Sequence, residues 1–422
     1  MTGRRITTGL LALLLTCAPA LALERSQRPP PRPAVAVASD VVEAAGASLA
    51  PWISAFRPRA LAAGIAPATF DRAMAGVRLL PDVVRRDRSQ AEFTKTLWDY
   101  LDSAVSDVRV RNGRAALARH RDALAAIERR TGVPAEIVAA IWGLESAYGA
   151  FRGDVPTLSA LATLAAEGRR AAFFEAQLVA ALRIVEAGDV GPEGMRGSWA
   201  GAMGHTQFMP TSFLDRAVDH DGDGRRDIWG DDPADALASA GAYLAGFGWR
   251  PGEPWGMEVR LPRGFPYALT GETTVRTAAE WSRLGVVTAE GAALPPSDRV
   301  SILVPAGAEG AAFARYPNFG VIERYNPADA YVIGVGHLAD RLRGGLPIQA
   351  AWPRGDRALT GDERRELQRR LLAAGFDPGG VDGRVGPMTL DAVRRWQAAE
   401  GLLPDGYASP RLLDRLRAGP GA

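Results

Sequence analysis

Apolar residues recur at helical intervals along most of the chain from residue 51 onward. Segments with this period cover 51–75, 89–131, 134–148, 157–187, 233–246 and 329–343. Between residues 256 and 325 the pattern changes to short apolar runs typical of strands, at 257–261, 300–305 and 319–325. We therefore predict an α+β fold that is mostly α-helical, with a small β subdomain before the helix at 329–343.

A further set of helical patterns follows at the C-terminal end and predicts a separate small domain over 358–418. Its apolar positions fall into three groups: Leu367, Leu371 and Leu372; Leu390, Val393 and Trp396; and Leu412, Leu413 and Leu416. A three-helix unit of this size is near the lower limit for independent folding. Residues 346–357, which contain Gly and Pro, form the linker before it, so the main domain spans 49–345.

The first 22 residues have the pattern of a cleaved signal peptide. Arg4 and Arg5 precede an apolar run at 10–15, and Ala-Leu-Ala at 20–22 forms a small-residue cleavage site. The apolar run is too short for a permanent transmembrane helix. We therefore expect an exported, periplasmic protein.

Cys17 is the only cysteine of the chain and would be removed with the signal peptide. Thr16 before it fits a lipoprotein site poorly, so lipid or membrane anchoring is the less favoured alternative. Residues 23–48 are rich in proline and predict an extended linker.

Composition and charge exclude some classes of function. The formal net charge is +2 and there is no long basic run, so we expect no nucleic-acid partner. The four histidines lack the spacing of a zinc site.

The strongest candidate for chemistry is Glu145, within the helical segment from 137 to 149. Glu145 follows Ile141 by four residues and Val138 by seven, so it projects toward the same apolar face. A carboxyl group held there loses solvation, which raises its pKa and lets it donate a proton near neutral pH. The alternative is a structural glutamate neutralised by one of the many arginines.

A glycine-rich segment at 197–210, GSWAGAMGHTQFMP, contains the second candidate, Gln207. Its amide can donate and accept, which suits a sugar hydroxyl or N-acetyl group. The alternative is a turn that lets two helices pack closely. We expect His205 to be structural.

The third candidate is the acidic sequence DHDGDGRRDIWG at 219–230, which matches the first part of an EF-hand calcium loop. Position twelve is Gly230 where a carboxylate is expected, although acids follow it directly. The predicted ligand set for a structural Ca²⁺ ion is Asp219, Asp221, Asp223, Arg225 and Asp231. The alternative is a solvated acidic turn.

These motifs together carry a family resemblance. ESAYG at 145–149, GAMGHTQFMP at 201–210, SAGAYL near residue 243 and RYNPADAY at 324–331 resemble the membrane-bound lytic transglycosylase B family over about residues 50–345. The resemblance implies a lysozyme-like catalytic domain with an EF-hand-like loop, which cleaves peptidoglycan between N-acetylmuramic acid (MurNAc) and N-acetylglucosamine (GlcNAc). Glu145 matches the family's single catalytic acid/base. The positions matching its substrate-binding cleft are Tyr100, Ser146, Arg169, Arg170, Gln207, Tyr243, Tyr325, Asn326 and Tyr331.

The C-terminal sequence DGRVGPMTLDAVRRWQ at 382–397 resembles the bacterial peptidoglycan-binding domain. The resemblances imply glycan strands of peptidoglycan as the partner, other cell-wall enzymes as further partners, and a monomer. They imply no cofactor for the chemistry.

A single glutamate suits a lytic transglycosylase, because the substrate's own C6 hydroxyl replaces the second carboxylate that most glycosidases need. The product would be a 1,6-anhydro-MurNAc end. Two alternatives stay open: a hydrolytic muramidase, with Asp154 or Glu175 as the second carboxylate, and a non-catalytic protein that only binds the cell wall.

Overall fold

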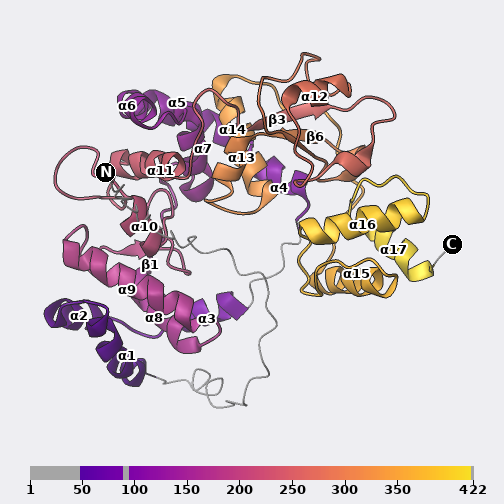
Figure 1. Ribbon diagram of the computed structural model, residues 1–422. Helices are drawn as coiled ribbons and strands as arrows, with labels where there is room; N and C mark the ends of the chain where they lie inside the picture. The colour runs from indigo at the N-terminus through magenta and orange to yellow at the C-terminus, as the bar shows by residue number, and fades with distance from the viewer. Residues whose placement is uncertain (1–47, 89–94, 420–422) are drawn as a thin grey trace, which may run out of the picture. The chain divides into compact units, whose positions relative to one another are not determined.

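The computed structural model describes residues 48–88 and 95–419, shown in Figure 1 as the coloured ribbon. The predicted signal peptide, Cys17 and nearly all of the 23–48 linker lie outside the described residues. Within the described ranges, no helix has the length and apolar character needed to cross a membrane.

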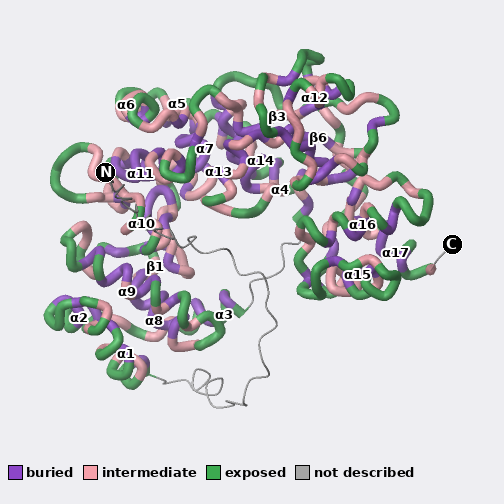
Figure 2. The backbone as a smooth tube through the Cα atoms, in the orientation of Figure 1, coloured by how far each residue is buried: buried purple, intermediate pink, exposed green. Residues whose placement is uncertain are grey.

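The first helical layer joins the N-terminal helices to a pair from the middle of the chain. Its members are α1 (Ala50–Ala62), α2 (Pro67–Met74), α3 (Pro81–Arg88), α8 (Thr157–Glu167) and α9 (Ala171–Ala187). The predicted segment 51–75 is two helices because Gly64 adopts a left-handed φ of 92° and Pro67 starts a new helix. Gly168 ends α8 in the same conformation, at φ 92°. Figure 2 shows the buried faces of α8 and α9 at the centre of this layer.

The second helical layer holds the glutamate. Its members are α4 (Leu97–Ala104), α5 (Asp107–Arg119), α6 (Arg121–Thr131), α7 (Ala135–Ser146), α10 (Pro210–Arg216), α11 (Ala234–Gly246) and α14 (Asp329–Arg343). The side chains of Thr96 and Ser106 accept hydrogen bonds from the first turns of α4 and α5. These caps explain why the predicted segment 89–131 is several helices. α7 lies among α5, α6, α11 and α14, and most of its residues are buried.

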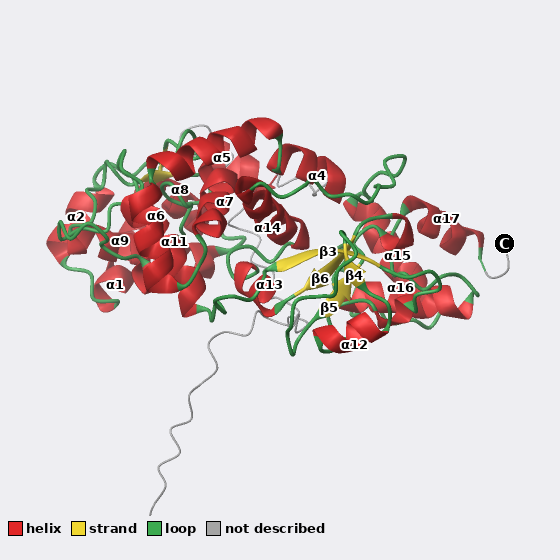
Figure 3. Ribbon diagram, turned by 90° about the horizontal axis from the view of Figure 1, so that it is seen from above, coloured by secondary structure: helices red, strands yellow, loops and turns green. Residues whose placement is uncertain are grey.

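The small β subdomain is a four-stranded antiparallel sheet in the order β4-β3-β6-β5. Its strands are β3 (Gly256–Arg260), β4 (Val287–Thr288), β5 (Ser301–Leu303) and β6 (Ala312–Arg315), with Met257 opposite Ala314. Figure 3 shows this sheet beside α12 (Ala278–Arg283). Two short 3₁₀ turns, η1 (Tyr267–Leu269) and η2 (Gly307–Glu309), lie in its loops, and β1 (Val155–Pro156) pairs with β2 (Arg196–Gly197) elsewhere.

The predicted strand at 319–325 is wrong, because this segment begins inside the helix α13 (Pro317–Ile322). Pro317 stands at the first helical position, where its fixed φ favours a helix. Phe319, Val321 and Ile322 are all buried, so the apolar run fits a buried helical turn as well as a strand. The strand just before it, β6, lies inside the sheet between β3 and β5.

The C-terminal domain has the three predicted helices, α15 (Gly361–Ala373), α16 (Pro387–Ala399) and α17 (Pro410–Ala418). They enclose a core of their own around Leu367, Leu371, Val393 and Leu413. Two predicted core positions were wrong: Leu372 is 52% exposed and Leu390 is only partly buried. Leu372 follows Leu371 directly, so it points about 100° away around the helix.

The predicted fold class, a mostly helical α+β chain with a small C-terminal helical domain, is confirmed. One close contact fastens the β subdomain to the helices: the ring of Trp255 lies flat against Gly336 in α14, and its Nε1 donates a hydrogen bond to Asp340 at 3.0 Å. A Cβ at residue 336 would overlap the ring.

We predict that Gly336→Ala lowers the free energy of unfolding by about 1–3 kcal/mol through overpacking. Alanine is otherwise the better helix former by about 1 kcal/mol, so any loss must come from the Trp255 contact. Urea unfolding of the full chain measures the effect. Gly76→Ala is the control, because a Cβ there meets no atom within 4 Å. Equal or greater stability of Gly336→Ala would contradict this packing.

Candidate active site

Glu145 lies one residue before the end of α7, facing the first turns of α14. Its carboxylate oxygen Oε1 accepts a hydrogen bond from the Tyr331 hydroxyl at 2.7 Å. Burial raises the pKa of Glu145 from its usual 4.5 to about 7, and the Tyr331 hydrogen bond opposes that rise. A carboxyl group with this pKa holds a proton on about half of the molecules at pH 7, as a general acid/base requires.

Three tyrosines, from α11, the segment between α13 and α14, and the first turn of α14, form one wall beside Glu145. This tyrosine wall consists of Tyr243, Tyr325 and Tyr331. The rings of Tyr325 and Tyr331 stack with centroids 6.5 Å apart, and the Tyr243 ring meets Tyr325 edge-on at 5.0 Å. Burial raises the pKa values of Tyr325 and Tyr331 well above 10, so both hydroxyls keep their protons and act as donors.

Tyr100 in α4 also belongs to this region. Burial, and then the nearby charge of Glu145, raise the pKa of Tyr100 to about 12. Its ring edge lies against Gly334 of α14, where a Cβ would approach to 3.1 Å. The structure therefore brings together Glu145, Tyr100 and the tyrosine wall, from helices far apart in the sequence.

The chain leaves α7 through a strained turn directly after Glu145. Ala147 and Tyr148 both adopt left-handed φ angles, 50° and 61°, which costs non-glycine residues free energy. The Tyr148 hydroxyl donates to the Arg109 carbonyl at 3.0 Å, and its ring fills space that Gly143 leaves free. These contacts hold the turn and fix the direction of the end of α7.

Ser146 has a different role from the predicted substrate contact. Its side chain is buried, and its hydroxyl donates to the His205 carbonyl at 2.6 Å and accepts from the Gly149 N–H at 3.0 Å. Since both contacts are internal, Ser146 positions the end of α7 rather than binding substrate.

His205 joins the same helix to the end of the acidic loop. Its Nδ1 accepts from the Trp142 indole at 3.1 Å, so Nε2 carries the proton and donates to the Gly230 carbonyl at 2.8 Å. Burial lowers the pKa of His205, which keeps the ring neutral. The histidine is structural, as the sequence predicts.

Gln207 adopts a left-handed φ of 52° in the glycine-rich segment. Its amide Nε2 donates to the carbonyls of Arg152, at 2.9 Å, and Gly204, at 2.8 Å. These bonds hold the amide nitrogen in place. Asn326 similarly caps a turn before α14, its Oδ1 accepting from the Ala328 N–H at 3.1 Å.

The paired arginines are anchored by side chains of the first helical layer. Arg169 pairs with Asp87, with Nε 2.8 Å from Oδ2, and Arg170 lies over the Phe173 ring at 4.3 Å. Neither candidate for a second carboxylate adjoins Glu145. Glu175 is bound at both oxygens by Arg59, at 2.7 and 3.0 Å, and Asp154 is exposed.

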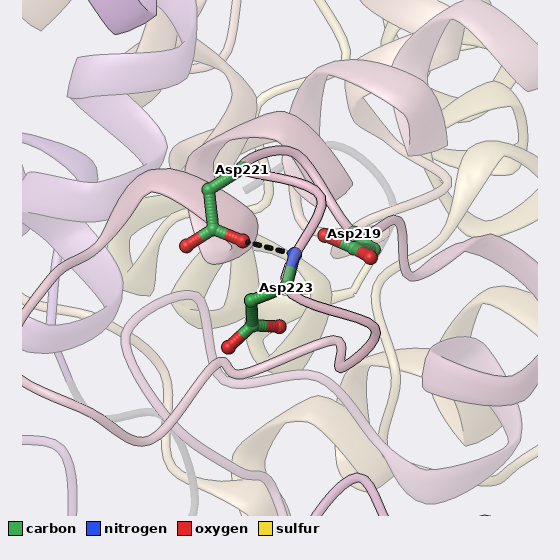
Figure 4. A group of neighbouring side chains, drawn as sticks. All are labelled: Asp219, Asp221 and Asp223. Carbon is green, nitrogen blue, oxygen red and sulfur yellow. Dashed lines mark hydrogen bonds between the residues drawn. The ribbon is translucent and has the colours of Figure 1, made fainter.

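The acidic loop gathers three of the five predicted metal ligands. One carboxylate oxygen from each of Asp219, Asp221 and Asp223 lies within 4.8 Å of the other two. Figure 4 shows the three side chains grouped on the loop. Main-chain N–H groups orient them: Gly222 and Gly224 donate to Asp219 at 2.7 and 2.9 Å. A set of hard oxygen donors in this arrangement fits Ca²⁺.

The end of the acidic loop is held by Arg152 instead of turning inward. Arg152 donates to the carbonyls of Trp229 and Gly230, and its Nη2 lies 3.1 Å from Asp231 Oδ1. Asp231 therefore lies apart from the group of three. The main-chain N–H of Arg225 donates a hydrogen bond to Asp223 Oδ1 at 2.8 Å. The buried Asp235 closes the loop, accepting from the His220 and Asp227 N–H groups at 2.7 and 2.8 Å.

Sequence reasoning missed two positioning residues, Tyr148 and Asp235. Tyr148 is part of the ESAYG motif, but nothing in the motif shows its left-handed conformation. Asp235 follows Pro233 at the start of α11, and the sequence places it outside the twelve-residue loop pattern.

Comparisons with known proteins identify the two domains. A model of the transglycosylase SLT domain matches residues 48–340, and a model of the putative peptidoglycan binding domain matches 360–416. Membrane-bound lytic murein transglycosylase B of Escherichia coli (strain K12) is 32% identical over 250 residues. That alignment spans 58% of this chain and 66%, just under two thirds, of the relative.

Solved structures are similar over a larger part of the chain. SltB3 from Pseudomonas aeruginosa, in complex with NAG-anhNAM-pentapeptide, is 51% identical with a TM-score of 0.85, covering 88% of this chain and 100% of that one. The same protein is known in complex with NAG-NAM-pentapeptide. Escherichia coli Slt35 in complex with calcium is 27% identical with a TM-score of 0.58, covering 70% of this chain and 92% of that one. The chain therefore belongs to the transglycosylase SLT domain family, the lytic transglycosylases that cleave peptidoglycan, and carries a peptidoglycan-binding domain after the catalytic one.

Proposed function

We propose that the protein cleaves the β-1,4 bond between MurNAc and GlcNAc and leaves 1,6-anhydro-MurNAc ends, with Glu145 as its single acid/base. The observation that carries the proposal is the buried carboxyl group of Glu145. Among the described residues, burial and the Tyr331 hydroxyl are the influences on its pKa, and no second carboxylate is among them.

The first step uses Glu145 in its protonated form. Its O–H donates the proton to the glycosidic oxygen, the bond from C1 of MurNAc to that oxygen breaks, and GlcNAc leaves as an alcohol. The electron-deficient C1 that remains is stabilised by the neighbouring N-acetyl group, as in substrate-assisted glycosidases.

The second step uses the carboxylate that the first step leaves. Glu145 accepts the proton of the MurNAc C6 hydroxyl while O6 bonds to C1, which closes the anhydro ring and restores the protonated glutamate. The Tyr331 hydroxyl stabilises the carboxylate between the two steps, because it donates to Oε1 at 2.7 Å.

The structure favours this route over the alternatives. A hydrolytic muramidase requires a second carboxylate to activate water or form a covalent intermediate. Arg59 already binds Glu175, and Asp154 is exposed. A protein that only binds the wall has no use for a buried glutamate whose pKa lies near 7.

We further propose that the protein acts in the periplasm as a monomer on glycan strands, beside other cell-wall enzymes and without a nucleic-acid partner. The signal-like pattern of residues 1–22 supports export. The match of residues 360–416 to a peptidoglycan-binding domain supports the choice of polymer.

We also propose that the acidic loop binds one structural Ca²⁺ ion through Asp219, Asp221 and Asp223, and that the chemistry needs no cofactor. Support comes from the convergence of the three carboxylates and from the calcium complex of the related Slt35. The ion would brace the loop whose far end His205 and Arg152 tie to the catalytic helix.

Glu145→Gln is predicted to lower cleavage of purified sacculi by on the order of 10³-fold or more, because the amide can neither donate nor accept the reacting proton. Release of soluble muropeptides measures the rate. At pH 8 the melting temperature should equal or exceed that of the wild type, because the substitution removes a buried charge.

Glu175→Gln and Asp154→Asn are the matched controls, and both should retain activity. Activity lost in either control would indicate a second carboxylate and therefore a muramidase. A Glu145→Gln protein that cleaves normally, or that unfolds like a core mutant, would remove Glu145 from the mechanism.

The pH dependence of kcat/KM should follow the protonated form of Glu145. With a pKa of about 7, kcat/KM is expected to be level in the acidic range and to fall about tenfold per pH unit above 7. Tyr331→Phe removes the hydrogen bond that lowers this pKa, so its falling limb should move to higher pH. Tyr267→Phe, in the β subdomain, should leave the profile unchanged. A limb that moves to lower pH in Tyr331→Phe would contradict the assigned contact.

Removal of calcium with EGTA should lower the melting temperature, and restored Ca²⁺ should raise it again. At a hundredfold excess of Ca²⁺ over Kd, the free energy of unfolding should increase by about 3 kcal/mol. Asp221→Asn should abolish this response. Asp231→Asn should keep it, since Asp231 pairs with Arg152 outside the group of three. A melting temperature indifferent to EGTA and Ca²⁺ would reject the ion.

A further inference from the structure

The C-terminal domain contains a turn that links the middle of α15 to the start of α16. Gln368 donates from Nε2 to Asp382 Oδ1 at 3.0 Å and accepts the Gly383 N–H at 2.8 Å. The Arg384 N–H also donates to Asp382 Oδ1, at 2.8 Å. The side chain of Arg365, three residues before the glutamine, covers the glycine, where a Cβ would approach Arg365 Nη1 to 3.2 Å. We call this arrangement turn A.

The same arrangement occurs again between α16 and α17. Gln397 donates to Asp405 Oδ1 at 2.8 Å and accepts the Gly406 N–H at 2.8 Å. The Tyr407 N–H donates to Asp405 Oδ1 at 3.0 Å. Arg394, again three residues before the glutamine, covers the glycine. We call this turn B, and the two turns, which read VDG at 381–383 and PDG at 404–406, form a short internal repeat.

The side chains of turn B form hydrogen bonds with the catalytic domain. The second oxygen of Asp405, Oδ2, accepts the main-chain N–H of Ala308 at 3.0 Å. Arg394 Nε donates to the Thr270 hydroxyl at 3.3 Å. Gly307 makes this approach feasible: its φ is 69°, and a Cβ there would lie 2.5 Å from Asp405 Oδ2. The aspartate and arginine of this turn thus recognise an amide N–H beside an oxygen acceptor.

Turn A offers the same two groups to solvent. Within residues 95–419, Asp382 Oδ2 has no hydrogen-bond partner, and Arg365 forms only a long ion pair with Asp362, at 3.8 Å. Two apolar side chains beside the turn are exposed, Val381 at 39% and Met388 at 61%. Polar groups without partners and exposed apolar side chains together are typical of a binding surface.

We propose that turn A binds peptidoglycan, with Asp382 Oδ2 accepting an amide N–H of the polymer and Arg365 donating to an adjacent oxygen. The inference rests on the proposed action of the protein on peptidoglycan and specifies how the C-terminal domain holds the polymer. The amide belongs either to an N-acetyl group of the glycan or to the stem peptide. Val381 and Met388 cover the apolar part of the same ligand.

Binding of the full-length Glu145→Gln protein to insoluble sacculi tests the proposal, because this parent leaves the polymer uncut. Sedimentation at a series of protein concentrations gives Kd. Adding Arg365→Glu should weaken binding about tenfold or more, as expected for the loss of one charge-assisted hydrogen bond. Met388→Ser, at an exposed position that carries no folding contact of the core, should weaken it in the same direction.

Arg369→Glu is the matched control, since it makes the same charge change at an exposed position of the same helix. It should bind within about twofold of the parent. If Arg365→Glu, Asp382→Asn and Met388→Ser all bind as tightly as Arg369→Glu, turn A is not the binding surface. If Arg369→Glu weakens binding as much as Arg365→Glu, only general charge attraction is at work, which also overturns the proposal.

Sacculi from which an amidase has removed the stem peptides distinguish the two sources of the amide. If the difference between parent and Arg365→Glu persists on these glycan strands, turn A binds the N-acetyl group. If the parent loses its binding to them, turn A binds the stem peptide. Either result supports the site, whereas full binding by the parent with no effect of Arg365→Glu on either polymer rejects it.

Failure of this inference is distinguishable from failure of the proposed function. Arg369→Glu in a chain with intact Glu145 should still form anhydro products from short soluble glycan chains at the wild-type rate. An intact chain that forms no such products but shows the Arg365 effect on sacculi would reject the proposed chemistry and leave turn A as a binding site.

Discussion

The partly buried carboxyl group of Glu145 accepts a hydrogen bond from the Tyr331 hydroxyl, and this contact joins the two helices α7 and α14. Burial raises the pKa of Glu145 from 4.5 to about 7, which corresponds to about 3 kcal/mol of native-state free energy. Because the pKa is higher in the folded chain, this stability is present below pH 4.5 and is lost as the pH rises through 7. The packing of α7 among four other helices must offset that loss.

The position of Glu145 depends on several contacts that fix the end of α7. A proton donor must be held within a fraction of an ångström of its target, so the turn after it cannot move freely. Ala147 and Tyr148 sit in left-handed conformations that cost free energy, and Ser146 and His205 hold them through buried hydrogen bonds. His205 also contacts Gly230, at the end of the acidic loop. Order in that loop is therefore connected to the position of the Glu145 carboxyl group.

Periodicity along the chain predicted the helix at 329–343 and the burial of Glu145, because both depend on neighbours within a few turns. It could not predict that Tyr331 donates to Glu145, since 186 residues separate them and only tertiary packing brings them together. It mistook 319–325 for a strand, because a short buried helix has the same apolar run. Ser146 was assigned to substrate from the family motif, whereas its hydroxyl is used inside the protein. The two turns of the C-terminal domain are visible in the sequence as VDG and PDG, but their common bonds to Gln368 and Gln397 are not, since the loops before the two aspartates differ in length.

The central claim is that the substrate's own C6 hydroxyl, and not water, completes the reaction at a single carboxyl group. Digestion of sacculi in H₂¹⁸O, followed by mass spectrometry of the released muropeptides, tests it directly. The mechanism predicts products that are lighter by one water than hydrolytic muropeptides and that carry no ¹⁸O at the new end. Products that carry one ¹⁸O at the MurNAc reducing end would show that water attacks C1, and would contradict the assignment of Glu145 as the sole acid/base of a lytic transglycosylase.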